Sequence, residues 1–276
     1  MQSVEPLTRR MYQLVEPIHL VTYFSEEPTA ELMALGCRNY WDGYFAGRAA
    51  PLGQAPAAVV HAAFYNFADG EVDRHIPRVW TITTPAEALA ARERGAVAAL
   101  RRILGELADS PGLVRAADLA TKAALGAAPE GRALFAGLRA LPVPEEPVAR
   151  LWHAATLLRE HRGDGHIVAL VANGIGGTEA HVLLALSDGM PAHEFGRVHH
   201  LPSAYLDAVI DGMRDRDLIG TDGWLTETGR ATKRRIEALT DELAEPPYAC
   251  LSADELERLI DELTPIAAAL NAAGSR

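Results

Sequence analysis

The sequence has few of the features that build cross-linked, metal-bound or membrane-spanning proteins. Its 276 residues include two cysteines, Cys37 and Cys250, which stand far apart and in no metal-ligand spacing. We therefore expect two reduced thiols and neither a disulfide framework nor a zinc knuckle. The N-terminal MQSVEPLTRRMYQLVEP lacks the apolar core of a signal peptide, and no window approaches the ~18 apolar residues of a spanning helix. These absences predict a soluble, cytoplasmic protein that does not contact a membrane.

Basic charge is scarce as well. The chain has 26 Lys and Arg against 37 Asp and Glu, which gives a formal net charge of −11. Such a chain repels nucleic acid and anionic membranes unless it gathers its basic residues on one face. Nucleophile motifs, phosphate-binding loops and dinucleotide fingerprints are absent too. We expect no cofactor, and the reaction class of any enzyme activity stays open.

Strand-like alternation of apolar and polar residues is almost absent from the chain. Ala-rich and Leu-rich segments with helical spacing dominate instead, and 49% hydrophobic residues are ample for a core. The most regular segment, residues 85–107, starts with a proline and continues in strong helix formers. A stiff PVPEEP break at residues 142–147 is the best domain boundary. The sequence predicts an all-α fold with at most a small β-wing.

Residues 189–239 contain the order of elements of a winged helix. They read as a helix (192–200), a second helix (202–217), a hairpin (218–226) and an exit helix (227–239). Pro202 suits the first turn of the second helix, and Asp222-Gly223 suits the hairpin turn. The stretch from about residue 176 to 243 resembles the winged helix of the MarR-type regulators, and an ordinary helical hairpin is the alternative. The resemblance implies a DNA-binding transcriptional regulator.

A weak internal repeat links the two halves of the chain. Asp42-Gly43-Tyr44 aligns with Asp164-Gly165-His166 at an offset of 122 residues, since 164 − 42 = 122. A repeat predicts two related helical lobes, tandem and winged-helix-like, with the first one degenerate. Chance similarity between Ala-rich stretches is the alternative. The expected parts are an N-terminal lobe (1–84), connecting helices (85–147), the winged helix-turn-helix lobe (148–243) and a C-terminal helix (244–276).

Four short motifs extend a family resemblance over nearly the whole chain. They are YFAGRAAPLG (44–53), FYNF (64–67), HRGDGH (161–166) and EAH (179–181). With them the chain resembles an actinobacterial family that is described as helix-turn-helix. The resemblance implies a two-lobed helical fold and gives no reaction.

The stretch HRGDGHIVALVANGIGGTEAHVL concentrates ionisable residues at two predicted helix starts. Asp164 could cap a helix that begins near His166, and Thr178 could cap the next, with Glu179 in its first turn. Capping does not explain His166 and His181, which each begin an apolar run; satisfied core histidines are the alternative. We predict that His166, Glu179 and His181 share a pocket and carry out acid–base catalysis. A metal site built from these three residues is a weaker alternative.

A ligand site is predicted where the first lobe faces this stretch. Arg48 lies in an apolar neighbourhood, where an unpaired charge is costly, so it needs an acid such as Asp164 or Glu179, or a bound anion. A buried structural salt bridge is the alternative reading. The predicted ligand-binding residues are Tyr44, Arg48, Tyr65, Asn66 and Asp164. The predicted ligand is a small, anionic molecule held between the lobes.

The DNA-binding alternative has poor electrostatic support. The presumed recognition helix, residues 202–217, carries four Asp against two Arg, whereas phosphate neutralisation supplies most non-specific binding energy. The residues that would contact DNA are Ser203, Tyr205, Arg230, Lys233, Arg234 and Arg235. We expect weak or absent DNA binding and favour a small-molecule ligand or substrate. Whether two copies form a homodimer stays open.

Overall fold

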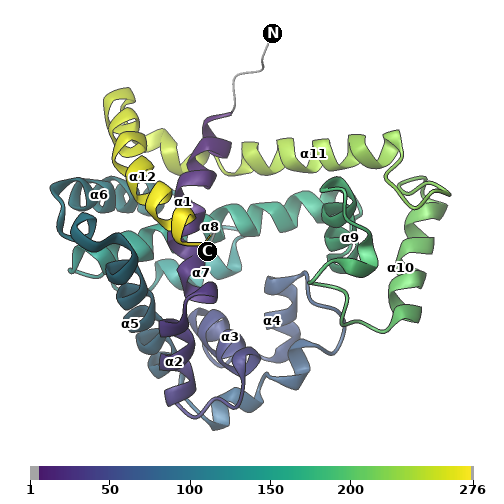
Figure 1. Ribbon diagram of the computed structural model, residues 1–276, viewed down its shortest axis with the longest axis horizontal. Coiled ribbons are helices and arrows are strands. Elements are labelled where there is room, and N and C mark those ends of the chain that lie inside the picture. The colour runs from purple at the N-terminus through teal and green to yellow at the C-terminus, as the bar shows by residue number, and fades with distance from the viewer. Residues whose placement is uncertain (1–5, 275–276) are drawn as a thin grey trace.

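The chain folds into α-helices. The computed structural model describes residues 6–274, and the β pairing in that range is one isolated bridge between Ile219 and Leu225. Figure 1 shows a large helical body, from which two helices, α8 and α11, extend to a smaller end. The predicted all-α class is confirmed.

The helices of the body come from both ends of the chain. They are α1 (Leu7–Phe24), α2 (Glu26–Ala34), α3 (Tyr40–Ala49), α4 (Ala57–Phe64), α5 (Pro85–Leu104), α6 (Pro111–Gly126), α7 (Ala133–Arg139) and α12 (Ala253–Gly274). The longest helix, α8 (Pro147–Ala172), leads out of the body to α9 (Gly177–Ser187), α10 (Ser203–Asp215) and α11 (Glu227–Leu243). Short 3-10 helices lie at Ala50–Leu52, Val72–Arg74, Arg78–Thr81, Gly105–Asp109, Ala192–Glu194 and Pro246–Cys250.

The long helices begin where their sequences predict. At the start of α5 the hydroxyl of Thr84 accepts a hydrogen bond from the backbone N–H of Glu87 at 3.2 Å, and the Glu87 carboxylate accepts one from the backbone N–H of Thr84 at 2.9 Å. This reciprocal capping satisfies two N–H groups that have no partner within the helix. Before α12 the hydroxyl of Ser252 accepts from the backbone N–H of Glu255 at 3.2 Å in the same way.

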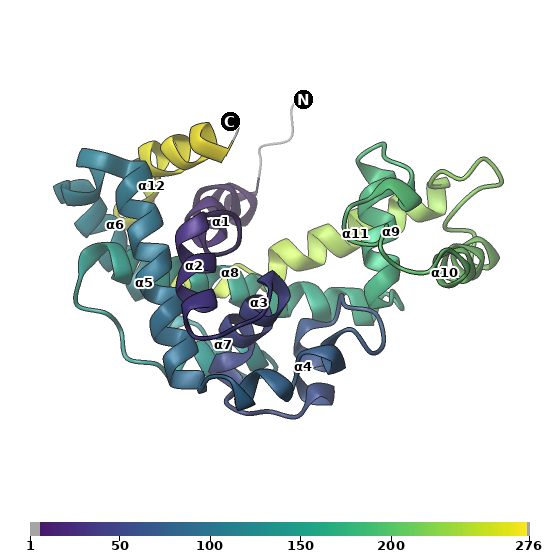
Figure 2. The same ribbon diagram turned by 60° about the horizontal axis from the view of Figure 1, so that its bottom comes forward.

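Two hydrophobic cores hold the molecule together. The larger core is built from residues between Met11 and Leu158, and the apolar face of α12 completes it. The smaller core, from Ala169 to Ile236, joins the end of α8 to α9, α10 and α11. The boundary between the cores falls inside α8, so one continuous helix belongs to both. In Figure 2, α11 runs back from the smaller end to the body alongside α8.

The predicted turn at Gly163-Asp164-Gly165 is wrong, because these residues lie within α8. Asp42, in contrast, lies in the first turn of α3. The two Asp-Gly pairs are not equivalent helix starts, and the described residues show no tandem lobes. Gly165 serves packing: a Cβ there would lie 2.7 Å from Nη1 of Arg132 and 3.3 Å from Cβ of Leu243. A glycine that ordinarily suggests a turn is here required by close contacts.

The start of α9 also differs from the prediction. The helix begins at Gly177 and not after Thr178, and the Glu179 carboxylate accepts a hydrogen bond from the backbone N–H of Gly176 at 2.8 Å. Glu179 therefore lies in the first turn, as predicted, but Thr178 is not the cap. Gly177 is needed because a Cβ there would lie 2.0 Å from the backbone oxygen of Tyr65.

Only some elements of the predicted winged helix form. Helices α10 and α11 form as predicted, while the hairpin between them is reduced to its single bridge. Of the first predicted helix, residues 192–200, only the 3-10 turn at Ala192–Glu194 forms, and that prediction is wrong. The backbone of Phe195 is extended and Gly196 follows it, and glycine in a helix interior costs about 1 kcal/mol relative to alanine.

Within the described residues, no helix is by itself long and apolar enough to cross a membrane. The pair α8 and α9 reaches that length and composition together, but the two helices are bent by 98°. Most of α8 between Val148 and Leu170 is buried within the protein.

Candidate functional site

Charged side chains meet inside the body, where α1, α3, α5 and α8 converge. This group, called the arginine cluster below, comprises Arg48, Arg92, Arg159, Glu160 and His19. Arg48 comes from α3 and Arg92 from α5, and the adjacent Arg159 and Glu160 come from α8. Since burying charge is costly unless it is paired, a cluster with such an excess of arginine points to a function.

Arg48 has the acidic partner that its apolar neighbourhood predicts, but the acid is Glu160. Nη2 of Arg48 lies 3.5 Å from Oε2 of Glu160, and Nη1 donates a hydrogen bond to the hydroxyl of Tyr44 at 2.7 Å. The prediction that Arg48 is largely buried and paired with an acid is confirmed. Asp164 and Glu179, the two acids named in advance as its partners, are not in this contact.

Arg92 is the unusual member of the cluster. It is 1% exposed, and within residues 6–274 it makes no ion pair or hydrogen bond. Its Nε and Nη2 are buried without a partner, and the guanidinium carbon lies 5.3 Å from the ring centroid of Trp152. A desolvated cation–π contact of this kind stabilises a charge by about 2 kcal/mol, below the cost of several kcal/mol for burying an unpaired ion. Arg92 therefore lacks an anion.

Glu160 balances only part of the positive charge. It is 1% exposed and accepts a hydrogen bond from Nη1 of Arg159 at 3.0 Å. Burial acts to raise the pKa of Glu160, but Arg159 and Arg48 outweigh it and hold the pKa at about 2. Burial, reinforced by Arg159, lowers the pKa of His19 well below 6.5, so His19 is neutral. The cluster thus contains three cations and one anion.

A cavity opens onto two of the arginines. Its lining consists of Thr22, Tyr23, Thr29, Leu32, Met33, Asn39, Tyr40, Gly43, Tyr44, Gly47, Arg48 and Arg92. The hydroxyl of Tyr23 and Nε of Arg48 are buried without partners, as are the two free nitrogens of Arg92. About 20 Å³ admits water-sized groups, within about 350 Å³ of atom-free space that includes open solvent at the mouth. The part that water can enter therefore has room for one or two water molecules.

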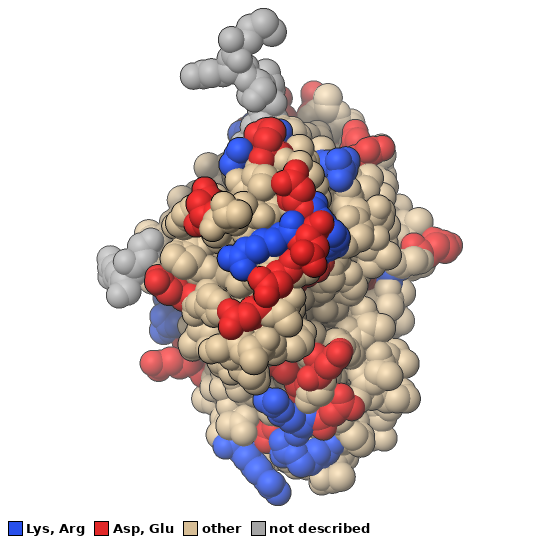
Figure 3. Space-filling model, turned by 90° about the vertical axis from the view of Figure 1, so that its right-hand side faces the viewer, with Lys and Arg blue, Asp and Glu red and all other residues tan. Residues whose placement is uncertain are grey.

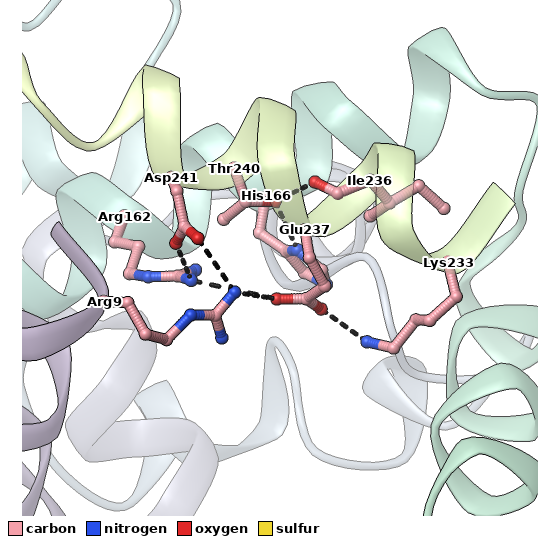
Figure 4. Close-up of polar contacts among 8 residues, drawn as sticks. All are labelled: Arg9, Arg162, His166, Lys233, Ile236, Glu237, Thr240 and Asp241. Atoms are coloured by element: carbon pink, nitrogen blue, oxygen red, sulfur yellow. Dashed lines mark hydrogen bonds and ion pairs between the residues drawn. The ribbon is translucent and has the colours of Figure 1, made fainter. Parts of the chain in front are cut away.

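His166 does not face this cavity's arginines but packs between α8 and α11. Its Nδ1 lies 2.9 Å from the hydroxyl of Thr240, and burial lowers its pKa to about 4. In Figure 4, His166 lies beside ion pairs that join α11 to the body. These are Arg9 with Glu237 at 2.7 Å and with Asp241 at 3.0 Å, and Arg162 with Asp241 at 2.7 Å. Within α11 itself, Lys233 also pairs with Glu237. The environment of His166 is that of a helix–helix contact.

His181 and Glu179 have other partners. The pKa of His181 is lowered to about 4, mainly by burial and also by the charge of Arg197, while a hydrogen bond with the backbone of Asn66 opposes the shift. Glu179 pairs with Arg216. The structure therefore gives His166, Glu179 and His181 separate contacts. Among the described residues, no three His, Cys, Asp or Glu side chains are grouped to hold a metal ion.

The other predicted ligand-binding residues divide between two places. Tyr44 and Arg48 line the cavity, whereas Tyr65 and Glu179 line a shallow groove of about 490 Å³ between the end of α4 and the start of α9. The hydroxyl of Tyr65 donates to the backbone oxygen of Ile175 at 2.5 Å and so joins the body to the smaller end. Asn66 follows Tyr65 and meets His181 through its backbone.

Asp164 has a structural partner in the body. Its Oδ2 accepts a hydrogen bond from the backbone N–H of Phe135 at 3.0 Å, in the first turn of α7. Asp164 had been predicted to cap a helix that begins near His166. Instead it caps α7, a helix that lies elsewhere in the chain. Burial is the main cause that raises its pKa to about 6.

The residues of the DNA-binding alternative are engaged with other protein groups. Arg230 and Arg234 both pair with Glu227, at 3.1 and 2.7 Å, Lys233 pairs with Glu237, and Arg235 donates to Asn173 at 2.6 Å. The hydroxyl of Tyr205 lies 3.2 Å from that of Thr178, and Ser203 is exposed at the first position of α10. Figure 3 shows basic and acidic side chains side by side in the upper part of this face, and a group of basic side chains at its lower edge.

The sequence analysis missed Arg92, Glu160, His19 and Tyr23. A signal existed for Arg92: it lies on the face of α5 that also presents Ala88, Ala96 and Ala99, all of which are buried. A charged residue in the alanine face of an amphipathic helix indicates a buried charge. Glu160 gave no such signal, because Arg-Glu-His in a helix resembles an ordinary solvated surface.

Comparisons with known proteins give one match. A model of a helix-turn-helix family matches residues 8–276 of the chain. No curated protein and no solved structure matches it.

Proposed function

The chain belongs to this helix-turn-helix family, and from that premise we propose that it binds a small anionic molecule in the cavity of its helical body. Arg48 and Arg92 hold the anion, and Tyr23 and Tyr44 orient it. Guanidinium and phenol groups are the donors that proteins use to bind carboxylate and phosphate. The winged-helix end of the molecule does not read DNA in this proposal.

The observation that carries the proposal is the unpaired state of Arg92. Replacing a buried ion by an apolar residue is often neutral or stabilising, so an arginine that is buried without an acid lowers the stability of the ligand-free protein. A bound anion removes that cost and supplies acceptors for Nε and Nη2. Binding and stability are therefore coupled through this one side chain.

The charges of the smaller end support the same conclusion. The exposed face of α10 carries Asp207, Asp211 and Asp215, and its one basic residue, Arg214, pairs with Asp211 at 2.7 Å. A helix with this charge is repelled by a major groove lined with phosphates. The basic residues after the wing would have to leave Glu227 and Glu237 before they could bind phosphate.

The test is isothermal titration calorimetry with inorganic phosphate and with acetate. We expect at least one of the two to bind the wild-type protein, and the Arg92→Met variant to lose that binding by at least about tenfold, which corresponds to one lost charged interaction. Arg94→Met is the matched control: Arg94 lies on the same helix, is exposed, and pairs with Glu31 at 2.8 Å. Equal binding by the wild type and Arg92→Met, or no binding of either anion, would contradict the proposal.

A further inference from the structure

The groove between the end of α4 and the start of α9, called the junction groove below, differs in chemistry from the arginine cluster. Its lining contains aromatic rings, small residues and two carboxylates, and among residues 6–274 no lysine or arginine lines it. We infer that the junction groove binds an organic ammonium ion with an apolar body. The inference is independent of the proposed function, because the groove and the cavity at Arg48 and Arg92 share no lining residue.

The first argument is the room in the groove. About 490 Å³ is open to water-sized groups, which lies within the range of roughly 300–1,000 Å³ that is usual for small-molecule sites. The space exists because small residues line it: Ala58, Ala62, Ala68, Gly176 and Gly177. The groove also lies where the larger core meets the smaller one, and such junctions between packed units are common places for ligands.

The second argument is a pair of anchored tyrosines. Tyr65 comes from the body, and Tyr205 comes from α10 at the smaller end. The hydroxyl of Tyr65 donates to the backbone oxygen of Ile175 at 2.5 Å, and the hydroxyl of Tyr205 lies 3.2 Å from that of Thr178. Within the described chain neither ring contacts another aromatic ring or a cation. The two rings are therefore held in place, with faces that can attract an ammonium group.

The backbone of Tyr65 supports a ligand site at this position. Its φ of 54° and ψ of −49° fall in a region that residues with bulky side chains rarely adopt, and the N–H of Asn66 donates to the backbone oxygen of Phe64 at 2.5 Å across the turn. Contacts hold Tyr65 in this conformation, since Gly177 packs against its backbone oxygen. Strained residues that are fixed by their surroundings are found preferentially at ligand-binding sites.

The third argument is the charge of the lining. Asp69 is exposed, and its side chain forms no ion pair or hydrogen bond within residues 6–274. Glu179, the other carboxylate, pairs with Arg216, so the two together add no net charge. His61 lines the groove as well, and its Nε2 lies 2.9 Å from the backbone oxygen of Phe67. Asp69 therefore leaves one uncompensated negative charge, which suits a ligand with one positive charge.

Other charged groups near the groove add little to this sum. Glu71 pairs with His200 at 2.6 Å. Arg197, which acts on the pKa of His181, is exposed and lies outside the lining, so water screens its charge. The phenol of Tyr65 stays protonated, since burial is the main cause that raises its pKa.

The experiment compares phenethylamine with phenethyl alcohol in NMR titrations of the isotope-labelled protein at pH 7.5. The two probes share one carbon skeleton, and only the amine is charged, because alkylammonium groups lose their proton at a pH of about 10. We expect phenethylamine to bind at least about fivefold more tightly and to shift the amide signals of Gly176 and Gly177. Equal affinity for the two probes, binding of neither, or signal changes that leave these glycines unaffected would overturn the inference.

Two acid variants separate a local site from the overall charge. Asp69→Asn should lower the affinity for phenethylamine about threefold or more and leave that for phenethyl alcohol unchanged. Asp73→Asn is the matched control and should change neither affinity, because Asp73 is exposed, lies outside the lining and forms no side-chain ion pair within residues 6–274. Equal losses in both variants, or an unchanged preference for the amine in Asp69→Asn, would overturn the inference. Either result leaves the proposed anion binding intact, because that binding depends on Arg92 and not on this groove.

Discussion

The two ends of the molecule use arginine in opposite ways. At the winged-helix end, Arg230 and Arg234 lie on the surface and share one exposed carboxylate, Glu227. In the body, Arg48 and Arg159 share one buried carboxylate, Glu160, while Arg92 forms no ion pair and interacts with Glu160 only at longer range. Exposed pairs are screened by water and contribute little, whereas buried charges change stability by several kcal/mol. The comparison shows that the costly buried charge, Arg92, lies in the body and not at the smaller end.

The largest effect is expected from neutralising each shared carboxylate in turn. Glu160→Gln removes the buried carboxylate that Arg48 and Arg159 share and should lower the free energy of unfolding by about 3–5 kcal/mol. Glu227→Gln, the matched variant at the other end, should leave it unchanged. Urea denaturation monitored by circular dichroism measures both. Equal losses in the two variants would show that the ends do not differ as described.

Acidification should unfold the protein through its buried histidines. The pKa values of His153, His161, His166 and His181 are lowered to about 4, mainly by burial, from an unfolded value of about 6.5. Between these values the unfolded chain binds protons that the folded chain does not, so stability falls as pH drops from 6.5 to 4.

Asp164 acts in the opposite direction in that pH range, but it is one group against four. Denaturation midpoints at pH 7.5, 5.5 and 4.5 test the net effect. A midpoint that stays constant over this range would mean that these histidines are solvated.

A smaller effect separates the two Asp-Gly sites that the sequence repeat aligns. Burial raises the pKa of Asp164 to about 6, so its charged form destabilises the folded state above that pH. Asp164→Asn should therefore raise the free energy of unfolding by about 1–3 kcal/mol at pH 7.5. Burial also acts to raise the pKa of Asp42, but hydrogen bonds from Arg78 and His75 outweigh it and hold the pKa at about 2. Asp42→Asn should therefore destabilise. Thermal unfolding of both variants at pH 7.5 and 4.5 tests the opposite signs, and a shared sign would contradict the account.

The smallest expected signal is DNA binding by the winged-helix end. Fluorescence anisotropy with duplex DNA at physiological salt should show only the non-specific range of roughly 10⁻⁴ to 10⁻⁶ M. Arg234→Gln should hardly change it, because that guanidinium is already paired with Glu227. Nanomolar, sequence-selective binding that Arg234→Gln abolishes would reverse the roles assigned to the two ends.

The sequence predicted those features that depend on residues close to one another in the chain. Helices α5, α11 and α12 follow from periodicity and capping, whereas the continuous α8 was predicted as two helices, and the acid beside Arg48 follows from the cost of an unpaired charge. The HRGDGH segment was misread as a turn because its glycines are set by distant neighbours. Gly165 accommodates Arg132, and Asp164 caps another helix, α7. Such tertiary contacts leave no periodic trace in the sequence.

Tyr44 and Arg48 of the candidate site were predicted, whereas Arg92 and Glu160 were not, because their contacts join distant parts of the chain. Tyr44 and Arg48 are one helical turn apart, so their contact is visible in the sequence. Arg92 and Glu160 come from helices far along the chain, and the packing of α5 against both α3 and α8 brings them near Arg48.

The stability of the ligand-free Arg92→Met variant tests the central claim most directly. If Arg92 serves to bind a ligand, the Arg92→Met variant has two effects. It removes an unpaired buried charge, and it also removes the anion site. Differential scanning calorimetry in a buffer free of phosphate and carboxylates should then show Arg92→Met melting at or above the temperature of the wild type, and added phosphate should raise only the wild-type value. A variant that melts well below the wild type in that buffer would show that Arg92 is a structural residue, and it would contradict the account.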